Sequence, residues 1–155
     1  MSDDVQASIE MAADPRAVYD IVTDVAQLPR WAAETVSCRW LDGADGPVVG
    51  ARFRGVNRHG PLRWWTTSTV TEARPGRCFA WKVTALRWPI AEWRYEIEPA
   101  DGGCRVTERT RNLTNPFFRR IVGPLGTGVA NRAEHNRRNM EKTLLALKEY
   151  VAASP

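Results

Sequence analysis

The sequence predicts one α+β domain over residues 1–155, in which a curved antiparallel sheet of about seven strands wraps around a long C-terminal helix. Two short helices are expected after the first strand. Two observations predict this architecture: residues 35–112 read as successive short strands separated by turn residues, and one long amphipathic pattern follows near the C-terminus. A bent sheet does not close completely around one helix, so we expect a gap between the layers that contains an apolar ligand.

The N-terminal elements follow from alternation and capping. Residues 5–11 alternate apolar and polar side chains, which is the period of a half-buried strand. Asp14 can cap a helix and Pro15 suits the first helical turn, so a helix is expected to begin there. Residues 28–31 begin a second short helix, and Trp31 is expected to be buried between helix and sheet.

Six further strands are predicted by alternating runs that end at turn residues. The turns are Asp42-Gly43, Pro75-Gly76 and Asp101-Gly102. The expected strands are Thr35 to Leu41, Val49 to Asn57, Leu62 to Glu72, Arg77 to Leu86, Ile90 to Glu98 and Cys104 to Asn112.

The turns also predict the register of the strands. If Asp101-Gly102 and Pro75-Gly76 are both two-residue turns, the partner of every flanking residue is determined. The inner-face pairs are then Ile97 with Val106, Tyr95 with Glu108, Trp93 with Thr110, Val70 with Trp81 and Ser68 with Val83. The outer-face pairs are Glu98 with Arg105 and Glu92 with Arg111.

The C-terminal helix has one apolar stripe, with Asn136 as its one polar member. Upstream, residues 116–128 mix apolar side chains with Gly and Pro, a combination that suits a mobile lid at the mouth of the gap. The stripe consists of Val129, Ala133, Asn136, Met140, Leu144, Leu147 and Val151.

Composition excludes several classes of protein. Hydrophobic residues make up 43% of the chain, and its seven tryptophans also exclude a disordered protein. No apolar run approaches the roughly 20 residues of a membrane-spanning helix, and the acidic N-terminus lacks the features of a signal peptide. We therefore expect a cytoplasmic protein without stable membrane insertion, either a monomer or a homodimer.

The cysteines and the positive charge predict little about function. Cys38, Cys78 and Cys104 lack the close spacing of a zinc or redox motif and are interpreted as reduced packing residues.

Between Arg105 and Arg138 the arginines far outnumber the acids, and such a patch can bind a phosphate or carboxylate. A solvated face is the simpler interpretation, so nucleic acid is not an expected partner.

Several motifs spread along the chain occur together. They are Asp14-Pro15, Val18, Thr23-Asp24, Leu28-Pro29 and Trp31, then Val49-Gly50-Ala51-Arg52-Phe53, then Val70-Thr71-Glu72-Ala73 with Pro75-Gly76-Arg77, Phe79 and Trp81, and finally Asn136 to Glu141 with Thr143-Leu144 and Leu147-Lys148. With these motifs nearly the whole chain resembles the START and Bet v 1-like superfamily, specifically the small bacterial polyketide cyclase/dehydrase-like (SRPBCC) proteins. The resemblance implies a helix-grip fold with its cavity between sheet and long helix. It does not select a chemistry, because such proteins include carriers and cyclases.

Two patterns predict which side chains bind the ligand. One is the alternation along each strand, which determines the inner face of the sheet, and the other is the helical stripe that faces it. About two of the tryptophans at positions 64, 65, 81, 88 and 93 are expected to reach the cavity, since aromatic residues in strands are mostly core. The predicted ligand-binding residues are Phe53, Val70, Trp81, Val83, Tyr95, Ile97, Val106 and Glu108 from the sheet, and Arg132, Asn136, Met140 and Leu144 from the helix.

Candidates for catalysis are few. His135 lies far from the apolar line of its helix and is expected to face solvent, and His59 belongs to a predicted hairpin tip. No metal-ligand spacing, phosphate loop or Ser-His-Asp set is present, so neither a metal nor a cofactor is expected. The candidates for proton transfer are Glu108, Tyr95 and Ser68.

Glu108 has two interpretations. A carboxyl in an apolar cavity has a raised pKa and can act as an acid or base, with Tyr95 as its hydrogen-bond partner. Alternatively, Glu108 pairs with Arg132 or Arg137 and anchors the helix on the sheet. We favour the ion pair, because buried charges generally persist only with partners.

Three functions remain open. A carrier or sensor of a hydrophobic molecule, lipid-like or polycyclic aromatic, is favoured by the aromatic lining and by the lack of a well-placed base. The alternative is a polyketide aromatase/cyclase or dehydratase that uses the same cavity. A third and weaker hypothesis is a macromolecular partner, RNA, ribosome or protein, at the Arg-rich face.

Overall fold

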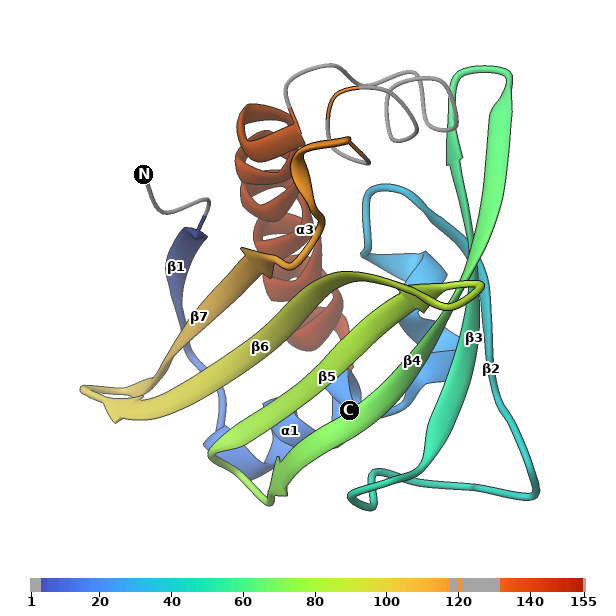
Figure 1. The fold of residues 1–155 in the computed structure, drawn as a ribbon. Helices are drawn as coiled ribbons and strands as arrows, with labels where there is room; N and C mark the ends of the chain where they lie inside the picture. The colour runs from blue at the N-terminus through green and yellow to red at the C-terminus, as the bar shows by residue number, and fades with distance from the viewer. Residues whose placement is uncertain (1–3, 118–119, 121–131, 155) are drawn as a thin grey trace.

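The structure is a computed structural model that describes residues 4–117, 120 and 132–154. Seven antiparallel strands form one curved sheet in the order β1-β7-β6-β5-β4-β3-β2, and α3 packs across its concave side against β1 and β7 (Figure 1). This is the predicted helix-grip α+β fold. The elements are β1 (Val5–Met11), α1 (Pro15–Val22), η1 (Val25–Arg30), β2 (Thr35–Trp40), β3 (Arg52–His59), β4 (Leu62–Arg74), β5 (Cys78–Ala85), β6 (Trp88–Ala100), β7 (Gly103–Asn112) and α3 (Arg132–Ala153).

The helices after β1 begin for the expected reasons. Asp14 caps α1, because its Oδ1 accepts the backbone N–H of Arg16 at 2.7 Å. The second helix, η1, is a 3₁₀ helix that begins at Val25, three residues earlier than predicted. Trp31 follows it and is buried as expected, with its ring centroid 5.1 Å from that of Tyr150 on α3.

The predicted register of β6 and β7 is confirmed. Ala100 pairs with Gly103 around a two-residue Asp101-Gly102 turn, in which Gly102 has a φ of 76°. All of the predicted pairs between these strands are present, including Tyr95 opposite Glu108. This turn therefore decides that Glu108 faces the concave side of the sheet.

The turn between β4 and β5 differs from the prediction. Arg74 pairs with Cys78, so the turn contains three residues instead of two. A one-residue irregularity follows in β4 between Val70 and Glu72 and cancels this shift. Because the two shifts cancel, Val70 pairs with Trp81. The predicted pair is therefore correct, although the predicted length of the turn was wrong.

The predicted start of β3 is wrong. Val49 was expected in the strand, but β3 begins at Arg52 and Val49 is 63% exposed. The reason is local: Gly50 adopts a φ of 91°, which no strand accommodates, and its N–H bonds to the carbonyl oxygen of Val70 at 2.9 Å. Asp42-Gly43 turns the chain as expected, yet it begins a long connection and not a tight hairpin.

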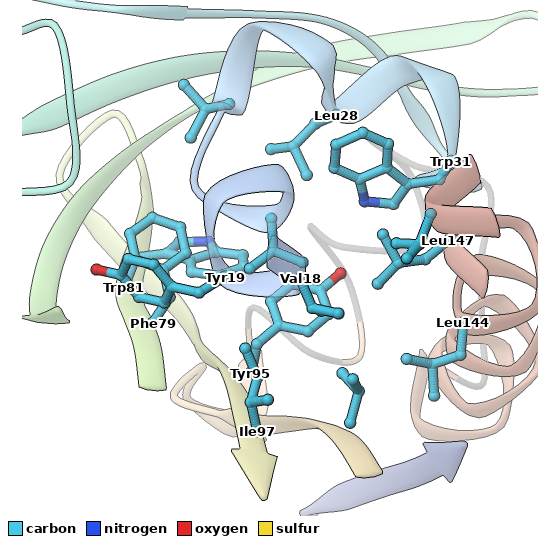
Figure 2. Close-up of a cluster of buried hydrophobic side chains, with 14 of the residues drawn as sticks. Val18, Tyr19, Leu28, Trp31, Phe79, Trp81, Tyr95, Ile97, Leu144 and Leu147 are labelled. Carbon is cyan, nitrogen blue, oxygen red and sulfur yellow. The ribbon is translucent and has the colours of Figure 1, made fainter. Parts of the chain in front are cut away.

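The core lies between sheet, α1, η1 and α3. Met140, Leu144, Leu147 and Val151 are buried on α3, so the predicted stripe is confirmed over the second part of the helix. Figure 2 shows Leu144 and Leu147 facing the aromatic residues of the sheet across the interior. The predicted stripe member Val129 and nearly all of the predicted lid lie outside the described residues.

Two further findings concern the described part of the chain. Cys38, Cys78 and Cys104 are free thiols, and the last two are buried, in agreement with a packing role. Among the residues that the structure describes, no helix is long and apolar enough to cross a membrane.

Candidate functional site

A cavity of about 160 Å³ lies between the sheet and α3. This volume accommodates a molecule about the size of benzene, whereas pockets that bind drug-sized ligands have volumes of roughly 300–1,000 Å³. Its lining combines aromatic and aliphatic side chains with several polar ones. The lining includes Leu28, Phe53, Trp64, Ser68, Trp81, Val83, Ile90, Trp93, Tyr95, Glu108, Asn136, Asn139, Met140 and Thr143.

The residues predicted to bind ligand divide into two groups. Those that line the cavity are Phe53, Trp81, Val83, Tyr95, Glu108, Asn136 and Met140. Val70, Ile97, Val106 and Leu144 are buried in the core and do not line it. The side chain of Arg132 lies outside the described part. The strand residues of both groups lie on the inner face of the sheet. The alternation of side chains along a strand therefore does not distinguish residues that line the cavity from residues of the core.

Aromatic rings form a continuous row along the inner face. Trp40 contacts Phe53 at 5.5 Å between ring centroids, Phe53 contacts Trp81 at 5.9 Å, and Trp81 contacts Tyr95 at 5.8 Å. Three tryptophans line the cavity, one more than the number expected, because Trp64 joins Trp81 and Trp93.

Glu108 lies opposite Tyr95, the last ring of this aromatic row. Only 5% of the residue is exposed, and burial raises the pKa of its carboxyl to about 8. A hydrogen bond with Tyr95 lowers the pKa in turn, but by less than burial raises it. The carboxyl is therefore mostly protonated at neutral pH.

The ion pair that we favoured for Glu108 is not observed with Arg137, and the side chain of Arg132, the other predicted partner, lies outside the described part. Within the described residues no arginine pairs with Glu108, its Oε2 has no hydrogen-bond partner, and Arg137 is exposed. Arginines of the sheet instead pair on its outer face, where Arg94 lies 2.7 Å from Glu72. The other interpretation, a neutral acid with a raised pKa, agrees with the surroundings of Glu108 that the structure describes.

A second polar group points into the same space. Burial and the neighbouring Glu108 raise the pKa of Tyr95 well above its usual value, so Tyr95 keeps its proton. In Figure 2 the Tyr95 hydroxyl and the Trp31 indole nitrogen point toward each other. A hydrogen bond from the Trp31 Nε1–H to this hydroxyl lowers the pKa of Tyr95 in turn, but its geometry is too poor to satisfy the indole nitrogen fully. Buried polar groups normally have partners, so the unpaired Glu108 Oε2 is an exception among the residues that line the cavity.

The expectation that His135 faces solvent is wrong. Its side chain is 20% exposed, its Nε2 lies 3.0 Å from Oε2 of Glu34, and its ring centroid lies 4.8 Å from that of His59. A helical projection identifies only the face toward the sheet, whereas the end of β3 and the segment before β2 cover another face of α3. Positions 34, 59 and 135 are far apart in the sequence, so their spacing contains no signal for this cluster.

The curved sheet, the long helix and the aromatic cavity between them define a helix-grip protein with an internal binding cavity. The chain belongs to the family described as polyketide cyclase / dehydrase and lipid transport, whose model matches residues 2–152.

Solved structures agree with this assignment. The Polyketide_cyc-like protein Cgl2372 from Corynebacterium glutamicum is 31% identical, with a TM-score of 0.64 over 98% of this chain and 93% of that one. The di-domain ARO/CYC StfQ from the steffimycin biosynthetic pathway is 14% identical, with a TM-score of 0.75 over 98% of this chain and 52% of that one. Ara h 8.0201 is 12% identical, with a TM-score of 0.69 over 97% and 98%. The last two share the fold alone. Among curated proteins, none matches this chain.

Proposed function

We propose that the protein binds a small, mainly apolar molecule with one hydrogen-bonding group, as a carrier or sensor. The observation that carries this proposal is Glu108 Oε2, a buried polar atom without a hydrogen-bond partner among the described residues, in a cavity with aromatic walls. A ligand hydroxyl beside Glu108 Oε2 satisfies this atom, while the apolar part of the ligand contacts Trp81 and Phe53. Membership in a family that includes lipid transport supports this function.

The cavity volume limits the ligand. About 160 Å³ accommodates a single ring with its substituent. A lipid-like or polycyclic ligand, such as the resemblance implies, requires the walls to move apart. We therefore expect the first measurable ligands to be monocyclic.

Phenol and toluene provide a matched pair of probes, because they differ mainly in a hydroxyl in place of a methyl group. We expect phenol to bind about threefold to tenfold more tightly, as one buried hydrogen bond predicts. Trp64, Trp81 and Trp93 line the cavity, so quenching of tryptophan fluorescence reports binding. The Glu108→Leu variant should lose the preference for phenol and still bind toluene. The Glu108→Gln variant should keep the preference for phenol. Equal affinity of wild type for both probes, or no binding of either, contradicts the proposal.

An enzymatic function is the second candidate, and the pKa of Glu108, raised to about 8, favours it. An acid that holds its proton near neutral pH can protonate a leaving hydroxyl during dehydration, and Tyr95 and Ser68 line the same cavity. Incubation of the pure protein with a poly-β-ketone thioester separates the two functions. An enzyme forms cyclised product and loses this activity in Glu108→Gln, whereas a carrier forms none.

A further inference from the structure

We propose that Glu34, His59 and His135 form a binding site for a divalent transition-metal cation, and that Zn²⁺ fits its donors best. One ligand atom from each residue lies within 4.8 Å of the other two. Glu34 Oε2 and His135 Nε2 are 3.0 Å apart. All three side chains are half-buried, so a cation can reach the cluster from solvent and is partly shielded from water once it is bound. This site does not depend on what the cavity binds.

The fold holds the three residues together through contacts of their neighbours. The Arg58 N–H donates to the Glu34 carbonyl oxygen at 2.9 Å, which places Glu34 beside the end of β3 and thus beside His59. The Ala33 N–H donates to Thr143 Oγ1 at 3.1 Å, which ties the same segment to α3. The end of β3 and the first turns of α3 lie at the same end of the molecule (Figure 1). The cluster is therefore positioned by the backbone and not by its side chains alone.

The donor set selects the kind of cation. Two imidazole nitrogens and one carboxylate oxygen are typical zinc ligands, whereas Ca²⁺ and Mg²⁺ prefer oxygen donors throughout. With metal–ligand distances of about 2.0–2.2 Å, the ligand atoms of a tetrahedral site are about 3.3 Å apart. The Glu34–His135 distance of 3.0 Å is already close to this spacing. His59 lies at the end of β3 beside Gly60, where side-chain torsions can close the remaining gap.

Three protein ligands leave one position of a tetrahedral zinc ion open. Glu34 and Asn139 line the cavity, and Asn139 Nδ2 lies 3.0 Å from His135 Nε2. A cation in this cluster would thus sit at the edge of the cavity. Its open position can take water or an oxygen atom of a bound molecule.

The composition of the chain makes the test specific, because His59 and His135 are its only two histidines. ZnCl₂ is added to the full chain, free of any histidine tag, and the imidazole signals are followed by NMR. We expect both rings to shift together and to saturate at one zinc ion per chain. Zinc should also raise the melting temperature of the wild type, since it binds only the folded arrangement.

Variants identify the ligands by calorimetric titration with zinc. His59→Ala, His135→Ala and Glu34→Gln should each weaken binding about tenfold or more, equal to about 1.4 kcal/mol. Cys38→Ser is the matched control for adventitious binding to thiols and should leave the affinity unchanged. Because His59 lies at a hairpin tip, His59→Ala is expected to fold even if His135→Ala does not. Absence of zinc binding, or equal affinity in wild type and His59→Ala, overturns the proposal.

Discussion

Tyr95 and Glu108 are direct partners across β6 and β7, and both are buried, with 2% and 5% of their surface exposed. The phenol and the carboxyl each have a raised pKa, because both would have to ionise in an apolar interior. The pair therefore remains uncharged at neutral pH and offers hydrogen-bonding groups without a net charge. Such a pair suits a neutral ligand better than an ionic one.

The first prediction concerns Glu108→Gln and pH. Folding raises the pKa of Glu108 from 4.5 to about 8, so between these values the folded state holds more protons than the unfolded state. The stability of the wild type should therefore fall as pH rises through this window, by at most about 1.4 kcal/mol per pH unit. Glu108→Gln should lack this decline and be the more stable protein at the upper end. Urea unfolding at a series of pH values measures the difference.

Glu141→Gln, at an exposed position on α3, is the matched control and should keep the pH dependence of the wild type. If Glu108→Gln instead lost about 1 to 3 kcal/mol at every pH, a charge-assisted hydrogen bond to Glu108 would be indicated. That result would restore the ion-pair interpretation.

Tyr95→Phe is expected to raise the pKa of Glu108 further. The Tyr95 hydroxyl donates the hydrogen bond that lowers this pKa, and phenylalanine keeps the ring without the donor. A pH titration of the Glu108 carboxyl by carbon NMR measures the midpoint in wild type and variant. Tyr19→Phe removes a hydroxyl from another buried ring, on α1, and should leave the midpoint in place. An unchanged midpoint in Tyr95→Phe would mean that the hydroxyl does not reach Glu108.

Gly103→Ala should destabilise the fold by at least about 2 kcal/mol. A Cβ at this position would lie 1.9 Å from the Met11 carbonyl oxygen and 2.9 Å from Ala12 Cα, both of them backbone atoms. The end of β1 would have to move away from β7 to make room. Gly46→Ala is the control, because nothing lies within 4 Å of its added Cβ. Thermal unfolding of both variants tests this, and similar melting temperatures would contradict it.

Leu147→Ala should cost about 2–5 kcal/mol, because the fully buried Leu147 packs α3 into the core and leaves a cavity when truncated. Leu145, two residues away on the same helix, is 57% exposed, and Leu145→Ala should change stability by no more than about 0.5 kcal/mol. Chemical unfolding compares the two. Equal losses would show that α3 does not pack in the orientation described.

Much of the site was predictable where a local turn controls the strands. The Asp101-Gly102 turn determines the partner of every residue in β6 and β7, which is why Tyr95 opposite Glu108 was predicted correctly. The β4–β5 pairs were correct for a different reason, because an extra turn residue and the irregularity after Val70 cancelled. Sequence patterns do not reveal such irregularities. The start of β3 was wrong because the backbone conformation of Gly50 overrides the apolar pattern around it.

The sequence by itself determined the fold class, the strands, the stripe of α3 and the inward direction of Glu108, since all of these depend on periodicity and on turns between neighbouring residues. The tertiary structure alone decided which inner-face side chains line the cavity, because Trp81 lines the space between sheet and α3 whereas Ile97, on the same face, is packed in the core. It also decided that Glu108 lacks an arginine partner among the described residues and that His59, His135 and Glu34 meet. These outcomes depend on distances between elements remote in sequence, and no local pattern encodes such distances.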